Sequence, residues 1–221
     1  ISPLFVKQGK PTSMKKILVW ASAVAIAAMA SVGLSTPAFA APVASPIIAV
    51  LGSYNFVSTS ADGTITAAFS EASGLSVYNS VTNEVVSFTN TELGVESSGE
   101  AVVSPDGAYI YLMGYDPEAI TVIDVVAQTI DRTITIPFEA WMGAITPDGQ
   151  TLIVYSYDSQ RIVKVALATD AVSGPLELGL DYPYQLCITS DSSTLYVPGY
   201  DAGYTATVSY THLTLPTKRI V

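Results

Sequence analysis

The stretch Ser104–Asp116, SPDGAYIYLMGYD, decides the fold of this chain. Its Pro-Asp-Gly is a turn signal, because proline presets φ and glycine accepts the left-handed conformation that closes a tight turn. The residues that follow alternate between two faces of a strand, with Tyr109, Tyr111 and Met113 opposite Ile110 and Leu112. Two β-branched runs come next, at 120–126 and 130–136, and such runs are typical of a sheet buried on both faces. The stretch and its continuation therefore predict four short strands joined by turns.

The same pattern occurs four times along the chain. Segments 57–71, 101–116, 143–158 and 186–201 align on the turn aspartates, which recur about every 43 residues at Asp62, Asp106, Asp148 and Asp191. A sheet of this kind cannot bury its faces alone, and four strands per 40 to 45 residues is the pattern of a β-propeller blade. No segment of 41–207 has a convincing helical period. We therefore predict an all-β chain, a partial β-propeller of about four four-stranded blades in an open arc.

Residues 104–136 also resemble the YVTN-type β-propeller repeats of secreted and surface-layer proteins, which combine a Ser-Pro-Asp-Gly turn with a later Val-Ile-Asp. The resemblance covers 57–207 and is best in the second and third copies. This chain departs from the pattern at the YVTN tetrapeptide, which reads Tyr-Leu-Met-Gly at 111–114 and Tyr-Val-Pro-Gly at 196–199. It departs again at Ala166, which replaces the aspartate of the Val-Ile-Asp motif, and at Ser192, which replaces the glycine of the turn.

The beginning of the chain has the three regions of a secretory signal peptide in order. Lys15 and Lys16 precede an apolar stretch at 17–34, and Ala38-Phe39-Ala40 provides a cleavage site. We expect a signal-peptide helix within 14–40, cleavage before Ala41 and an extracellular or cell-envelope location. An uncleaved membrane anchor is the competing interpretation, because the apolar stretch approaches spanning length. Residues 1–13 are interpreted as translated upstream sequence.

The end of the chain, 208–221, reads VSYTHLTLPTKRIV. Its first ten residues resemble a translated transposon-end adapter of a sequencing library, so we interpret this tail as non-native. The sequence at 215–217 is not a sortase signal, because Lys218-Arg219 supply neither the glycine nor the apolar helix that such a signal needs. His212, the single histidine, then has no function. The propeller at 41–207 is accordingly interpreted as C-terminally truncated, with open edges that favour aggregation.

The charge of the chain excludes one class of partner. All acidic residues lie between Asp62 and Asp201, where the only bases are Arg132, Arg161 and Lys164. A body this acidic repels phosphate backbones, so we expect no nucleic-acid binding. The single cysteine, Cys187, excludes an intrachain disulfide, and its apolar surroundings predict a small buried side chain.

Strand connectivity predicts where a ligand site would lie. The loops before the first strand of each blade and those between its second and third strands share one rim of a propeller. This rim would collect aromatic and acidic side chains around the central channel, namely Trp141, Tyr184, Tyr115, Asp116, Tyr157, Asp158, Tyr200 and Asp201. Such a rim can bind a sugar, a cationic peptide or a metal ion. The alternative is that each Tyr-Asp pair is a structural feature of the repeat, which makes Trp141 and Tyr184 the better candidates.

The sequence favours binding over catalysis. Before the tail there is no histidine, no cysteine pair, no phosphate-cradling glycine loop and no Ser-His-Asp set, so no catalytic residue, metal site or cofactor is indicated. We expect a binding or scaffold module whose partner is an extracellular protein, a glycan or a cell-wall component. It would meet the membrane only through the signal peptide. One alternative is a propeller enzyme, lactonase-like or quinoprotein-dehydrogenase-like, with its active site partly in missing blades. A propeller fused to adhesive modules is another.

Overall fold

The computed structural model describes residues 56–156, 158–180, 183, 185–199 and 205–209. The expected signal-peptide helix at 14–40, the upstream residues 1–13 and most of the tail lie outside these ranges. No helix in the described ranges has the length and apolar character to cross a bilayer.

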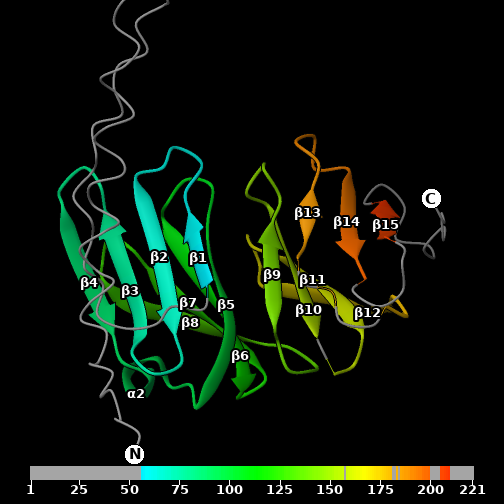
Figure 1. The fold of residues 1–221 in the computed structure, drawn as a ribbon, viewed down its shortest axis with the longest axis horizontal. Helices are drawn as coiled ribbons and strands as arrows, with labels where there is room; N and C mark the ends of the chain where they lie inside the picture. Colours follow the sequence, from blue (N-terminus) through cyan, green and yellow to red (C-terminus); the bar gives the residue numbers. More distant parts are fainter. Residues whose placement is uncertain (1–55, 157, 181–182, 184, 200–204, 210–221) are drawn as a thin grey trace, which may run out of the picture. The chain divides into compact units, whose positions relative to one another are not determined.

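The described residues form four antiparallel sheets in chain order, which we call blades 1 to 4 (Figure 1). Blade 1 contains β1 (Phe56–Thr59), β2 (Ile65–Ser70), β3 (Gly74–Asn79) and β4 (Glu84–Phe88). Blade 2 contains β5 (Ser97–Val103), β6 (Tyr109–Asp116), β7 (Ala119–Asp124) and β8 (Thr129–Thr135). Blade 3 contains β9 (Met142–Ile145), β10 (Thr151–Ser156), β11 (Arg161–Ala166) and β12 (Ala171–Glu177). Blade 4 contains β13 (Cys187–Ile188), β14 (Thr194–Pro198) and β15 (Thr205–Ser209).

Blade 2 is buried on both faces, as the sequence predicts. Ile110 and Leu112 of β6 pack in a cluster with Phe69 and Leu75 of blade 1. Tyr111 and Met113, one residue out of phase, pack in a second cluster with the blade 3 residues Leu152, Val154, Val163 and Val165. The two clusters lie on opposite faces of blade 2, because successive side chains of a strand point to opposite faces.

Blade 3 continues the stacking. Ile153 and Tyr155 of β10 point away from blade 2 and pack with Leu195 and Val197 of β14. Each of the three junctions thus joins consecutive blades through their faces, and the described sheets do not close. The fold is a partial β-propeller.

One hydrogen-bonded turn between the first two strands repeats in every blade. A hydroxyl side chain donates to the aspartate two residues later over 2.5 to 2.6 Å, in the pairs Ser60–Asp62, Ser104–Asp106, Thr146–Asp148 and Thr189–Asp191. The same hydroxyl accepts the backbone N–H that starts the second strand, as from Tyr109 to Ser104 over 3.0 Å. This arrangement explains why the Ser/Thr-x-Asp pattern marks each repeat: it satisfies buried polar groups where the chain reverses.

The turn aspartates couple stability to pH. Hydrogen bonds from the neighbouring hydroxyl, followed by backbone N–H groups, hold the pKa of Asp106 and Asp148 below the ordinary value. A lowered folded-state pKa contributes stability above the unfolded pKa and loses it as pH falls through the folded pKa. The four turns together therefore weaken below a pH of about 4.

Blade 4 has an imperfect version of this turn. Glycine occupies the left-handed position in the first three blades, with φ between 70° and 74° at Gly63, Gly107 and Gly149. Ser192 takes this conformation in blade 4, with φ of 58°. A left-handed conformation costs an ordinary L-residue about 1 kcal/mol.

We predict that Ser192→Gly stabilises the chain by about 0.5 kcal/mol, because relief of the left-handed strain exceeds the added entropy of an unfolded glycine. The urea midpoint measured by circular dichroism should rise. The reverse change, Gly149→Ser, should lower the midpoint, and a rise in both variants would contradict the strain argument.

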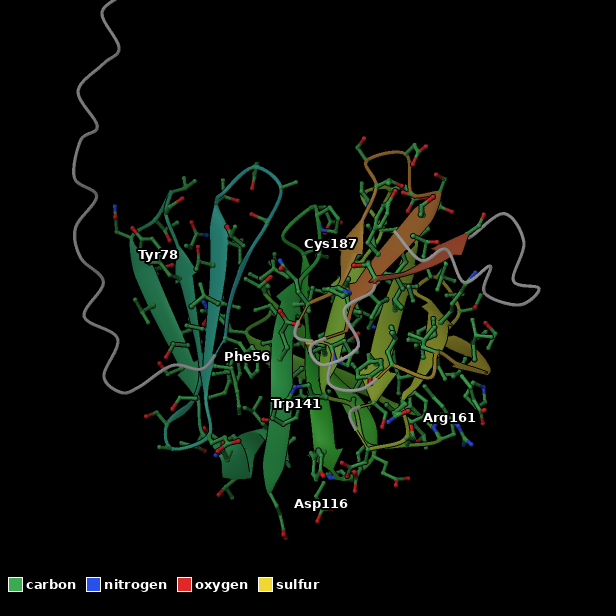
Figure 2. The ribbon with its side chains drawn as sticks, turned by 45° about the vertical axis from the view of Figure 1, so that its right-hand side comes forward. Phe56, Tyr78, Asp116, Trp141, Arg161 and Cys187 are labelled. Carbon is green, nitrogen blue, oxygen red and sulfur yellow. The ribbon has the colours of Figure 1, made fainter. Side chains whose placement is uncertain are left out.

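The structure corrects the sequence interpretation at three places. Cys187, expected to be buried, is exposed on blade 4, because its side of the strand faces away from blade 3 (Figure 2). A short helix, α2 (Asn90–Leu93), closed by a capping box between Thr89 and Glu92, separates blades 1 and 2, where no helical period was found. β6 includes Tyr115 and Asp116, which were expected in the following loop.

Candidate functional site

The site is centred on Trp141, which directly precedes β9 in the connection between blades 2 and 3. Its ring meets the ring of Tyr115 edge to face, with 6.3 Å between centroids. On blade 1, the ring of Phe56 makes a second edge contact with Trp141 at 6.2 Å (Figure 2). Three aromatic rings from three consecutive blades therefore meet at one point, as expected where inner strands converge.

Backbone contacts hold Trp141 from both sides. Its N–H donates to the carbonyl of Tyr155 and its carbonyl accepts from the N–H of Glu100, both over 2.9 Å. Gly99 permits the second contact, because a Cβ at that position would lie 2.0 Å from the Trp141 carbonyl oxygen. The ring is thus placed by the blade 2–blade 3 junction itself.

One hydrogen bond connects a Tyr-Asp pair of blade 2 with the pair of blade 3. The Tyr115 hydroxyl of blade 2 donates to Oδ2 of Asp158 of blade 3 over 2.8 Å. The two residues lie 43 positions apart, so the tyrosine of one copy binds the aspartate of the next. Blade 1 has Glu71 at the tyrosine position, so that position supplies no hydroxyl group to Asp116. For Tyr115 and Asp158, a bond between blades therefore gives the repeated residues a structural role that needs no ligand.

Excess negative charge surrounds this bond. Asp158, followed by burial, raises the pKa of Glu139, and the charges of Asp158 and Glu118 add to the effect. Burial raises the pKa of Glu100, against an opposing hydrogen bond from the Gly143 N–H. The hydrogen bond to Asp158, followed by burial, raises the pKa of Tyr115 to about 12. Three neighbouring groups with raised pKa values mark a candidate functional site.

We predict that deprotonation of Tyr115 opens this contact at alkaline pH. A raised folded-state pKa contributes stability that is complete below the unfolded value of about 10. This contribution is lost as pH rises from the unfolded value through the folded pKa of about 12. The Trp20→Phe variant leaves Trp141 as the single tryptophan. As pH is raised, its emission should change only near the raised pKa of Tyr115.

Asp158→Asn supplies the control, because it removes the charge that holds the Tyr115 proton. The emission change should then move down toward pH 10, the ordinary tyrosine value. A change that stays at the same pH in Asp158→Asn would show that Asp158 does not determine this titration.

The structure gathers part of the site expected from the sequence. Tyr115, Trp141 and Asp158 lie together, whereas Asp116 is exposed at the end of β6. The remaining expected residues, Tyr157, Tyr184, Tyr200 and Asp201, lie outside the described ranges. Sequence reasoning missed Phe56, Glu100 and Glu139. Glu139 lies two residues before Trp141 in the same loop, so the connectivity argument that selected Trp141 applies to it as well.

One hollow in the described residues lies at the opposite rim, between the turns of blades 2 and 3. It measures about 400 Å³ and includes Tyr109, Tyr111 and Arg132. The Arg132 guanidinium is already occupied, because Nε and Nη2 donate to Asp170 over 2.7 and 3.0 Å and Nη1 contacts Asp131. It also lies 5.6 Å from the centre of the Tyr109 ring. The charges of this hollow are therefore satisfied internally, which favours a structural role.

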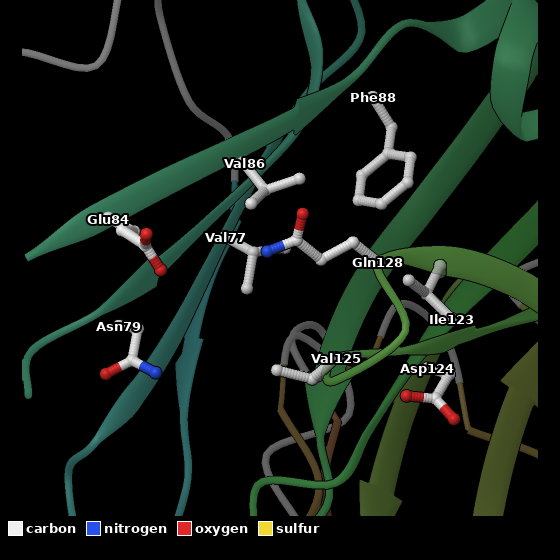
Figure 3. A pocket seen from close by; sticks show the side chains of 9 residues that line it. All are labelled: Val77, Asn79, Glu84, Val86, Phe88, Ile123, Asp124, Val125 and Gln128. Carbon is white, nitrogen blue, oxygen red and sulfur yellow. The ribbon is translucent and has the colours of Figure 1, made fainter. Parts of the chain in front are cut away.

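A smaller hollow of about 40 Å³ separates blade 1 from a turn of blade 2. Val77, Val86 and Phe88 line one side, and Gln128 extends toward them from the other (Figure 3). This volume holds about one water molecule, so it does not suit a larger ligand. Within the described ranges, no three His, Cys, Asp or Glu side chains form a group able to hold a metal ion.

No protein family and no curated protein matches this chain. Among solved structures, hydrazine synthase from Kuenenia stuttgartiensis is similar, with a TM-score of 0.58 over 70% of this chain. The sequences are 17% identical, and this chain spans 44% of that chain's length. At this identity the likeness concerns the fold alone, and it agrees with the partial propeller described above.

Proposed function

We propose that this chain is a secreted or cell-envelope binding module of the YVTN type, and that its rim around Trp141 binds a cationic segment of an extracellular protein. The single observation that supports the ligand class is the cluster of raised pKa values at Tyr115, Glu139 and Glu100 beside an aromatic group. A cation at this point would relieve repulsion among the acidic groups and allow all the carboxylates to ionise.

The ring arrangement suits the same ligand. Trp141 is half-buried, and tryptophan offers the best face for a lysine or arginine side chain. Glu139 is half-buried and Asp158 exposed, so both carboxylates are accessible from solvent. In the described ranges, neither carboxylate forms an ion pair with a lysine or arginine. Desolvated cation–aromatic contacts contribute about 2 kcal/mol, and nearby carboxylates add to the attraction.

The test is binding of a labelled lysine-rich peptide to the full chain, measured by fluorescence anisotropy. Glu139→Gln and Trp141→Leu should each weaken binding about tenfold, which corresponds to about 1.4 kcal/mol. Added salt should weaken binding further, since exposed charges are screened.

Glu84→Gln is the matched control, because it removes one negative charge on the outer strand of blade 1. Equal losses in Glu84→Gln and Glu139→Gln would show general attraction to an acidic protein and would refute a rim site. An unchanged affinity in Trp141→Leu would refute the aromatic part of the site.

An enzymatic function is the second candidate. A carboxyl group with a raised pKa beside a second carboxyl group, as at Glu139 next to Asp158, is an arrangement that general acid catalysis uses. Hydrolysis of a panel of lactones and glycosides that is abolished in Glu139→Gln but kept in Glu84→Gln would favour this candidate. Absence of turnover across the panel would favour the binding module.

A further inference from the structure

The junction of blades 2 and 3 carries polar side chains at positions where the junction of blades 1 and 2 is apolar. Strand register and repeat spacing identify the equivalent positions of the two junctions. Aliphatic residues of the first junction are replaced in the second by two tyrosines, an arginine and a glutamine. The equivalent pairs are Ile65–Tyr109, Ala67–Tyr111, Val86–Arg132 and Ala108–Gln150.

The polar junction also has more space between its blades. The hollow at the apolar junction measures about 40 Å³ (Figure 3), whereas the hollow at the polar junction measures about 400 Å³. Each reaches the turn after the third strand of the following blade, at Val125 and at Leu167, so the two hollows lie at related places in the repeat. The wider of the two falls in the range of about 300 to 1,000 Å³ that is typical of small-molecule sites.

Packing alone does not explain the polar residues of this junction. The ion pair of Arg132 with Asp170 holds blades 2 and 3 together and satisfies the guanidinium. Well-packed apolar side chains in place of a buried ion pair are often equally or more stabilising. The equivalent Ile65 and Ala67 are packed in this way in the core between blades 1 and 2. The polar groups beside the ion pair therefore need a reason other than stability.

Several polar groups of the hollow are available to a ligand. In the described ranges, Tyr109 and Gln150 form hydrogen bonds only through backbone atoms, so the phenol hydroxyl and the side-chain amide remain available. The neighbouring hydroxyl groups donate to Oδ1 of Asp106 and of Asp148, which leaves Oδ2 of each as an acceptor. All four residues line the hollow. It thus offers donors and acceptors beside an aromatic ring.

The charges of the hollow favour a neutral ligand. An anion would meet Asp106 and Asp148, and a cation would meet the Arg132 guanidinium. Sugars combine hydroxyl groups with apolar C–H faces, so they suit carboxylate and amide groups next to a tyrosine ring. We propose that the hollow between blades 2 and 3 is a binding site for a neutral sugar, separate from the rim around Trp141.

The test is saturation-transfer NMR of the full chain with glucose, N-acetylglucosamine, cellobiose and chitobiose, which are all neutral. Transfer to at least one of these sugars is expected. Gln150→Leu and Tyr109→Leu should each raise the Kd of that sugar about tenfold, because each removes a hydrogen-bonding group of the site. Gln150 is exposed, and its side chain forms no hydrogen bond to a described residue, so loss of binding in Gln150→Leu would not be a folding defect.

Gln128→Leu is the matched control, because Gln128 is exposed at the hollow between blades 1 and 2, and this variant should bind the sugar normally. The lysine-rich peptide should leave the transfer unchanged, since its proposed site is the other rim. Displacement of the sugar by the peptide would place the sugar at the Trp141 rim and overturn the proposal. No transfer to any of the sugars, or equal losses in Gln128→Leu and Gln150→Leu, would overturn it as well.

Discussion

Gly99→Ala is expected to destabilise the chain by about 3 kcal/mol, at the upper end for overpacking, because the added methyl group meets backbone that no side-chain rotation can move. Its Cβ would lie 2.0 Å from the Trp141 carbonyl oxygen and 2.7 Å from the carbonyl carbon. The strand β5 must then move away from Trp141, which breaks the Glu100 N–H contact to the same carbonyl. The variant should lose stability and the aromatic cluster together.

The measurement is a urea titration followed by circular dichroism and by Trp141 emission in the Trp20→Phe background. Gly63→Ala is the control, because Gly63 has φ of 74° but no atom within 4 Å of its added Cβ. Backbone strain alone should cost this control about 1 kcal/mol. If the two variants lose equal stability, close approach to Trp141 is not what requires glycine at position 99.

The close approach at Gly99 also shows the limit of the sequence argument. The blade pattern follows from side-chain alternation, which is local, so the two faces of β6 could be predicted from Tyr111 and Leu112 alone. The contact of Gly99 with Trp141 depends on how two blades converge at the axis. No local pattern encodes that distance, and a glycine in a strand is compatible with several roles.

Cys187 illustrates a different limit. Its apolar neighbours predict burial, and the equivalent Val102 is indeed buried. Periodicity identifies the face on which a side chain lies, but burial depends on whether another blade covers that face. The exposure of Cys187 therefore depends on the stacking of blades, not on its own strand.

Strand connectivity was enough to predict which loops contribute to the candidate site. The rule that certain loops share a rim was sufficient to bring Trp141 and Asp158 together. It did not show that Tyr115 binds the aspartate of the next copy, because that bond depends on the angle between blades. Glu139 was not predicted because it belongs to no repeated pair, although it lies in the same loop as Trp141.

Tyr155→Ala is expected to cost about 4 kcal/mol, within the range for removing a buried aromatic side chain. Tyr155 is fully buried and packs with Ile153, Leu195 and Val197 at the junction of blades 3 and 4. The cavity cannot refill easily, because rigid strands from both blades line it. The Tyr155 carbonyl also accepts the N–H of Trp141, so movement of β10 would loosen the candidate site from the side opposite Gly99.

Tyr155→Phe separates packing from hydrogen bonding. The Tyr155 hydroxyl donates to the Leu180 carbonyl over a long 3.4 Å, so this variant should lose about 1 kcal/mol or less. Chemical denaturation gives both values, and the Trp141 emission maximum should move to longer wavelength in Tyr155→Ala only. A loss in Tyr155→Phe as large as that in Tyr155→Ala would mean that the hydroxyl, not the ring, holds blades 3 and 4 together. The stacking of blade faces would then need polar support at this junction, and blade 4 would be held more by its loops than by its core.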